Sequence, residues 1–195
     1  LYFKYISFVG HVEVVIHRSL WTCVTLLLTT FFFSKWKIFF KLFFNKKKLF
    51  LLFISGFLIF INWSTWIYAI SNNRVIDASF GYFIMPIISI FLGYFFLKEK
   101  ISNKAKLAVA IVTFSILYLI IIDFKSIPWT GLVVAISWSV YNLIRKKINV
   151  DTDIGLLIES LFILPFITVA FYIITINSFN DFDISNPTLM FILTL

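Results

Sequence analysis

The sequence predicts an all-α protein that crosses a membrane several times. Of its 195 residues, 61% are hydrophobic and only 13% are charged, and the mean hydropathy is +1.00. Apolar stretches of about 20 residues, the length that a helix needs to cross a bilayer, recur along the chain. This composition excludes a soluble domain of this size. The net charge of +8 therefore indicates membrane topology, and we expect contact with membrane lipid and not with nucleic acid.

Eight helices are predicted along the chain. Residues 1–9 are expected to be the end of a first helix, and Gly10 and His11 to form a tight turn. Because the sequence starts at Leu1 and stops at Leu195 within apolar runs, we expect a fragment with sequence missing at both ends. The other predicted helices cover residues 12–33, 49–70, 75–97, 104–122, 126–147 and 154–176, with an eighth beginning at Pro187.

The basic residues alternate between loops. A lysine-rich amphipathic connector covers residues 35–48, and the loops after the helices at 75–97 and 126–147 are also basic. The remaining loops carry few basic residues. Since positive charge stays on the cytoplasmic side, this alternation predicts a cytoplasmic N-terminus for the full protein. It places Lys46 and Lys147 in the cytoplasm, and Asp77 and Asp183 on the opposite side.

The rest of the chain is organised around the helix between Ser71 and Lys100. Pro86 has no N–H to donate to the carbonyl of Tyr82, so this helix should bend and leave a polar carbonyl free. A row of five residues recurs at every fourth position, and its small members allow another helix to approach closely. Such a helix suits the wall of a cavity, and a kinked packing helix is the alternative. The residues of this row are Asp77, Gly81, Met85, Ser89 and Gly93.

An asparagine lies near the middle of the helix at 49–70. Asn62 must find a hydrogen-bond partner there, so it either bonds a neighbouring helix or lines a cavity. Ser55 and Trp66 lie on roughly the same stripe of that helix. Together with the bent helix, this stripe predicts a substrate path whose candidate residues are Asn62, Trp66, Gly81, Tyr82 and Pro86.

Three polar residues occur near the start of the helix at 12–33. Glu13 and His17 are four residues apart and share a face, whereas Arg18 points about 100° away. They form either a solvated helix end or a proton-linked gate, in which Glu13 and His17 face the path while Arg18 faces a partner helix. A metal site that includes His11 is disfavoured, because HVEVVIH does not match the HExxH ligand spacing.

Further polar residues lie within predicted spans. Glu159 is a carboxylate a few residues inside an apolar run, where it either binds a partner or titrates. Near the end of the preceding helix, Trp138 and Tyr141 are interpreted as membrane anchors. Cys23 lies in an apolar run and is expected to be structural. The candidates for coupling or gating are therefore Glu13, His17, Arg18, Asp77 and Glu159.

Several longer motifs resemble those of the RarD family of EamA-type transporters, which belongs to the drug/metabolite transporter superfamily. The resemblance implies ten helices in two inverted five-helix repeats, with residues 1–122 in the first repeat and 123–195 at the start of the second. RSLW and ESLF then occupy equivalent second-helix positions. The motifs are EVVIHRSLW (13–21), NWSTWIYAISNN (62–73), ASFGYFIMPIISIFLGYFFLKEK (78–100), IPWTGLVVAISWSVYNLIRKK (127–147) and GLLIESLFILP (155–165).

The expected function is transport of small metabolites across the bacterial cytoplasmic (inner) membrane, by a secondary-active exporter or permease that works by alternating access. A non-transporting assembly subunit and an intramembrane enzyme are the alternatives. No GxSxG, HExxH or paired intramembrane aspartates occur, so no catalytic residue, metal or cofactor is expected. The small-molecule substrate, proton coupling and homo-oligomer formation are left open.

Overall fold

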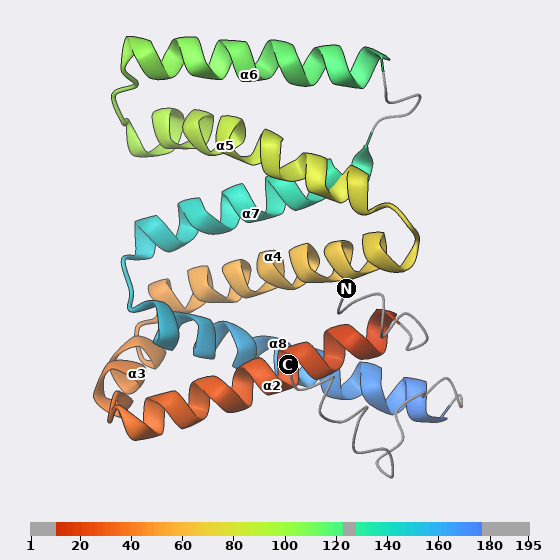
Figure 1. Ribbon diagram of the computed structural model, residues 1–195. Helices are drawn as coiled ribbons and strands as arrows, with labels where there is room; N and C mark the ends of the chain where they lie inside the picture. Colours follow the sequence, from red (N-terminus) through yellow and green to blue (C-terminus); the bar gives the residue numbers. More distant parts are fainter. Residues whose placement is uncertain (1–10, 123–127, 177–195) are drawn as a thin grey trace.

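The computed structural model describes residues 11–122 and 128–176, which form seven helices and no strand (Figure 1). The all-α fold is confirmed, and the helices predicted within these residues are found within a few residues of their expected ends. The helices predicted at 1–9 and from Pro187 lie outside the described residues. The seven helices are α2 (His11–Phe32), α3 (Trp36–Phe43), α4 (Lys46–Ser71), α5 (Val75–Leu97), α6 (Asn103–Ile122), α7 (Trp129–Ile148) and α8 (Thr152–Ile176).

Local capping interactions set several helix ends. α4 begins three residues earlier than predicted because Asn45 caps it, with Oδ1 accepting a hydrogen bond from the Lys48 N–H at 3.1 Å. The Asp151 side chain similarly accepts from the Asp153 N–H at the start of α8. Lys98 and Asn149 adopt left-handed backbone conformations, with φ of 55° and 47°, and end α5 and α7.

The amphipathic connector forms the short helix α3. Phe39 and Leu42 are buried and join a core cluster with Leu52 of α4 and Leu157 of α8. The lysines of α3 remain on its exposed side. The apolar face thus holds α3 against the end of the bundle where α4 and α8 begin.

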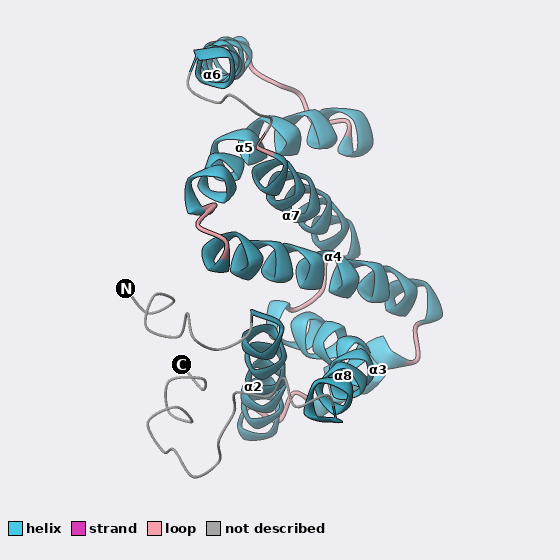
Figure 2. Ribbon diagram, turned by 90° about the vertical axis from the view of Figure 1, so that its right-hand side faces the viewer, coloured by secondary structure: helices cyan, strands magenta, loops and turns pink. Residues whose placement is uncertain are grey.

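The helices form two groups that share α4 (Figures 1 and 2). On one side of α4, α7 packs against both α4 and α5. On the other side, α2 and α8 pack against each other and against α4. α6 lies beside α5 at the edge of the molecule. α4 and α7 therefore occupy the centre of the described part of the chain.

α6 and α7 show opposite relations between apolarity and burial. Five of the described helices are long and apolar enough to cross a membrane: α2, α4, α5, α6 and α8. α6 belongs to this group, yet Ile116 is its one buried residue among those described. α7 carries serines and a basic end that keep it out of the group, yet it buries Ser137 and Ser139. In a lipid environment apolar residues can face outward, so the more polar helix marks the interior.

A pair of glycines sets the contact between α5 and α7. A Cβ on Gly81 would lie 2.4 Å from the carbonyl oxygen of Gly131, and one on Gly131 would lie 2.2 Å from that of Asp77. The row of small residues therefore does face another helix at Gly81. The same expectation for Gly93 is wrong, since a Cβ there would meet the Glu99 side chain, at 2.8 Å, in the turn that ends α5 and not another helix.

α5 changes direction about midway along its length (Figures 1 and 2). Pro86 lies inside the helix, as the predicted bend requires. The carbonyl of Met85, the residue before the proline, accepts a hydrogen bond from the Ser139 hydroxyl at 3.2 Å. Ser89 in turn donates to Ser139 at 3.2 Å. Serine side chains of α5 and α7 thus bridge the bend.

Candidate functional site

A cavity of about 170 Å³ lies where α2, α4, α5 and α7 meet. We call the end of the bundle at which α4 ends and α5 and α7 begin the cavity end; it is on the right in Figure 1. The cavity occupies this half of the helices. The described residues that line it are Arg18, Asn62, Trp63, Trp66, Tyr82 and Trp138.

Asn62 both lines the cavity and bonds a neighbouring helix. Its Nδ2 donates to the Val134 carbonyl at 3.0 Å and to Ser137 Oγ at 3.1 Å. Ser137 in turn donates to the carbonyl of Val133 within α7. From the sequence, Asn62 was expected either to bond a neighbouring helix or to line a cavity, and in the structure it does both. These bonds fix α4 to α7 at the cavity wall.

Aromatic rings form most of the cavity wall. Trp66 and Tyr82 meet edge to face, with ring centroids 5.4 Å apart. The guanidinium carbon of Arg18 lies 4.9 Å from the centroid of the Trp63 ring, which is a cation–π distance. The wall therefore combines one permanent positive charge with flat, polarisable surfaces.

Three of the five substrate-path candidates come together here: Asn62, Trp66 and Tyr82. Gly81 and Pro86 are not among the described lining residues. Gly81 is buried in the contact between α5 and α7, because a side chain there would overlap the backbone of α7. Pro86 is exposed and acts on the wall through the bend of α5.

The structure reverses the expected directions of the polar residues in α2. Glu13 and His17 are buried, and the His17 ring meets Phe171 of α8 edge-on at 6.2 Å. Arg18 is exposed and lines the cavity. The cause is the packing of α2 on α8: successive residues diverge by about 100°, so a face that turns His17 toward α8 directs Arg18 toward α4. Asp77 lies in the first turn of α5, half-buried.

A second polar cluster lies in the opposite half of the bundle, around Glu159 of α8. This carboxylate is fully buried and accepts hydrogen bonds from Ser55 Oγ at 2.5 Å and from the Tyr141 hydroxyl at 3.3 Å. The Arg145 guanidinium approaches the same carboxylate at 3.5 Å. We call these four residues the Glu159 cluster. It joins α4, α7 and α8.

Two glycines make room for the Glu159 cluster. A Cβ on Gly56 would lie 3.1 Å from the carbonyl oxygen of Glu159, so α4 passes close to α8 at this level. A Cβ on Gly155 would lie 1.6 Å from Nη1 of Arg145, so the arginine side chain crosses directly over Gly155. The Arg145 Nη2 also donates to the Thr152 carbonyl at 3.0 Å.

Exposed ion pairs lie at the same end. Lys35, which precedes α3, contacts Asp151 at 3.2 Å and Asp153 at 2.9 Å. Its hydrogen bonds to Asp153 and then Asp151 raise the pKa of Lys35 above its usual value. Lys146 of α7 pairs with Glu99 after α5. We call this half, on the left in Figure 1, the ion-pair end.

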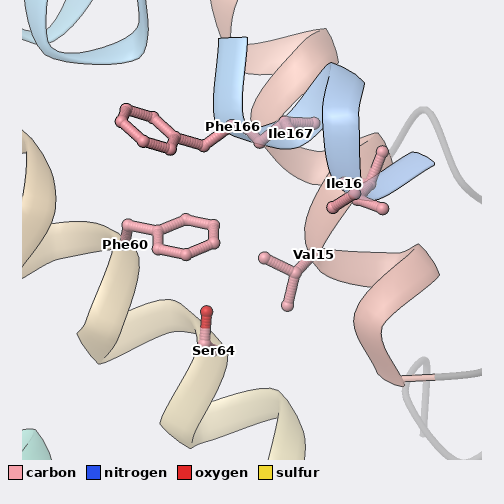
Figure 3. A pocket seen from close by; sticks show the side chains of 7 residues that line it. Val15, Ile16, Phe60, Ser64, Phe166 and Ile167 are labelled. Atoms are coloured by element: carbon pink, nitrogen blue, oxygen red, sulfur yellow. The ribbon is translucent and has the colours of Figure 1, made fainter. Parts of the chain in front are cut away.

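A separate, apolar crevice of about 90 Å³ lies between α2, α4 and α8 (Figure 3). Figure 3 shows Phe60 and Phe166 from α4 and α8, with Val15 of α2 facing them. Ser64 supplies the hydroxyl at its edge. With a nearly uniform apolar lining, this crevice offers little with which to recognise a polar solute.

Several residues of α7 that line the cavity or bond its neighbouring helices were not predicted as site residues from the sequence. Trp138 was interpreted as an anchor, but it lines the cavity beside Trp63. Ser137 and Ser139 were not singled out, although they bond α4 and α5 respectively. The signal that could have found them is the low apolarity of α7, since polar residues in a spanning helix turn toward the interior.

Comparison with known proteins places this sequence in a family. The sequence model of the EamA-like transporter family matches residues 1–121. An uncharacterized transporter of Vibrio cholerae is 33% identical over 89% of this chain and 57% of its own length. The RarD protein of Escherichia coli K12 is 34% identical over 91% of this chain and 60% of its own length. The uncharacterized transporter YojE of Bacillus subtilis is 33% identical over 85% of this chain and 56% of its own length.

No solved structure gives a significant match to the chain. The chain spans somewhat more than half the length of the curated relatives it matches. These relatives are bacterial and carry the names transporter and RarD, which agrees with the resemblance seen in the motifs. With its apolar helices and the match over residues 1–121, the chain is a multi-pass membrane protein that belongs to the EamA-like transporter family.

Proposed function

We propose that the protein moves small metabolites across the bacterial cytoplasmic membrane by alternating access. The observation that carries this proposal is the contrast along one pair of helices. α4 and α7 line an accessible cavity at one end through Asn62 and Trp138. They are tied to α8 at the other end by Ser55 and Tyr141 on Glu159. Such an arrangement suits a path that is open at one end and closed at the other.

The charge alternation orients this path within the proposal. The ion-pair end carries Lys46 and Lys147 and would face the cytoplasm, because basic loops stay inside. The cavity end would face outward, with Asp77 on that side. Residues 1–122 and 123–195 would belong to two inverted repeats, an architecture in which rocking of one bundle against the other exposes the site alternately.

Within the proposal, closure at the ion-pair end depends on contacts that can separate. The pairs of Lys35 and Lys146 are partly or largely exposed, so water can replace them at little cost. The Glu159 cluster is buried and would need water or another partner when α4 leaves α8. Opening this end would therefore expose a carboxylate to the path.

Coupling to protons belongs to the same proposal. Glu13, His17 and Glu159 are buried titratable groups within spanning helices, and such groups often mark proton or ion routes. Flux in proteoliposomes, measured with and without an imposed pH gradient, should respond less to the gradient after Glu13→Gln, His17→Gln or Glu159→Gln. An unchanged response in all three variants would assign these residues to packing.

Transport is tested by reconstituting the purified full-length protein. Proteoliposomes are loaded with a small-molecule extract of the bacterium, and compounds that leave or enter are identified by mass spectrometry. We expect a defined set of solutes to move faster than in protein-free liposomes. The variant Asn62→Leu, which fills the cavity wall, should reduce this flux. Flux equal to that of protein-free liposomes in both directions would favour the assembly subunit over a secondary-active exporter or permease.

A further inference from the structure

We infer that the cavity binds a small carboxylate whose body is a flat, apolar ring. This inference rests on the proposed transport function and specifies the class of solute that the cavity accepts. It is carried by the charge, the hydrogen-bonding state and the shape of the side chains around the cavity. Each of these disfavours a different kind of ligand.

The charge of the described lining favours anions. Arg18 is the charged side chain among the described residues that line the cavity, and a guanidinium keeps its charge at any physiological pH. Its planar fork can bind both oxygens of a carboxylate. An anion that enters the cavity is therefore attracted to this arginine. The same charge disfavours a cation in this space.

The hydrogen bonds of Asn62 leave the recognition of an anion to the arginine. Both hydrogens of its Nδ2 are used, on the Val134 carbonyl and on Ser137 Oγ. The amide therefore turns only an oxygen toward a ligand. A carbonyl oxygen accepts hydrogen bonds and cannot donate one to a carboxylate. The anionic group therefore belongs at the Arg18 side of the cavity.

The walls and the size favour one ring next to the charge. Trp63, Trp66, Tyr82 and Trp138 supply four aromatic surfaces, and Trp66 and Tyr82 already meet edge to face. Aromatic rings add specific edge-to-face contacts to the burial of apolar area. A cavity of about 170 Å³ accommodates a single ring with a short side chain.

The chain contains a matched control for Arg18. Arg74 lies over the Trp129 ring at 5.8 Å, so it also forms an arginine–tryptophan pair near the cavity end. Neither Arg74 nor Trp129 is among the described lining residues of the cavity. Substitution of Arg74 removes the same charge from the same half of the bundle and leaves the cavity lining intact.

The test measures binding by the purified full-length protein in detergent, followed through tryptophan fluorescence. The probes are 3-phenylpropanoate, its cationic analogue 3-phenylpropylamine, and hexanoate, an anion without a ring. We expect 3-phenylpropanoate to bind more tightly than either of the other two. Arg18→Gln should weaken its binding roughly tenfold to a hundredfold, as loss of a charge-assisted hydrogen bond does. Arg18→Lys should retain part of the affinity, and Arg74→Gln all of it.

Several outcomes would overturn the inference. They are equal or tighter binding of the amine, equal binding of hexanoate, undiminished binding after Arg18→Gln, or no binding of 3-phenylpropanoate at millimolar concentration. The comparison of the three probes on the wild-type protein needs no variant, so it stands even where Arg18→Gln fails to fold. A failed probe series with solute flux intact would reject this ligand class alone, whereas binding without flux would reject transport.

Discussion

The two ends of the bundle are built largely from the same helices, but their polar groups have opposite arrangements. At the cavity end, Asn62 and Arg18 surround an accessible space. At the ion-pair end, Ser55 and Glu159 contact each other directly and leave none between them. α4 is thus held to its neighbours by polar bonds at both ends, and an accessible space remains between the polar groups at the cavity end.

The kind of bond also differs between the ends. The bonds of Asn62 are neutral, and in membranes such bonds average less than about 1 kcal/mol. Glu159 instead collects two hydroxyl donors and a guanidinium in a fully buried position. Removing one partner of a buried pair costs more than removing a neutral bond, because it leaves a charge uncompensated. Substitutions of these polar residues should therefore affect stability mainly at the ion-pair end and transport mainly at the cavity end.

The largest effect is expected where a side chain would separate α5 from α7 altogether. Gly131→Leu places a Cβ 2.2 Å from the carbonyl oxygen of Asp77, and backbone cannot yield as a side chain can. We expect little or no folded protein, measured by fluorescence-detected size-exclusion chromatography. The control is Gly93→Leu, whose Cβ meets the movable, exposed Glu99 side chain. Wild-type yield of Gly131→Leu would show that the close contact is not required.

The next largest effect should come from breaking the Glu159 cluster. Arg145→Leu leaves the Glu159 carboxylate buried without its cation, which typically costs about 3–5 kcal/mol. We expect a clear drop in the thermal unfolding midpoint in detergent. The neighbouring Lys146→Leu removes an exposed charge pair and should change the midpoint little.

A double substitution makes the test of the cluster more specific. Arg145→Leu combined with Glu159→Leu removes both charges, so much of the lost stability should return. An additive loss in the double variant would mean that the two side chains do not depend on each other. It would also remove the reason to treat the ion-pair end as a charge-based closure.

At the cavity end, a substitution should reduce transport more than it reduces stability. Asn62→Leu removes two neutral bonds to α7 and should cost only about 0.6–2 kcal/mol of stability. Flux in proteoliposomes should fall much more, because the larger apolar side chain alters the cavity wall. Asn142→Leu is the control, since this asparagine of α7 is exposed and does not line the cavity. Equal flux in the two variants would mean that Asn62 is not part of the substrate path.

The fold could be predicted from sequence because each helix is a local pattern. Runs of apolar residues, polar turns and Pro86 are visible without any knowledge of packing. The helix ends predicted from them lie close to the observed ends, and capping by Asn45 explains why α4 starts earlier than expected. The row from Asp77 to Ser89 similarly identified the face of α5 that meets α7.

The sites were only partly predictable because they depend on how helices rotate about their axes. Ser55 and Glu159 are 104 residues apart, and nothing local in either helix specifies their contact. The directions of His17 and Arg18 depend on which face of α2 meets α8, and the expectation for them was wrong. In sequence, a tryptophan that lines a cavity looks the same as one that anchors a helix at the membrane interface. The place of Trp138 in the cavity could therefore be found only from the structure.

The smallest effect is expected at the exposed pairs of the ion-pair end. Hydrogen bonds to Asp153 and then Asp151 raise the pKa of Lys35 above its ordinary value of 10.5. A raised pKa means that the contacts favour the folded state while the lysine is charged, and that this contribution is lost as pH rises through the raised pKa. Near neutral pH, Lys35→Gln should therefore lower the unfolding midpoint only slightly, since both partners remain partly exposed. The difference between wild type and variant should shrink in a titration above pH 10.5 and with added salt. A drop as large as that of Arg145→Leu, or a difference that grows with pH, would show that the exposed pairs and not the Glu159 cluster close this end.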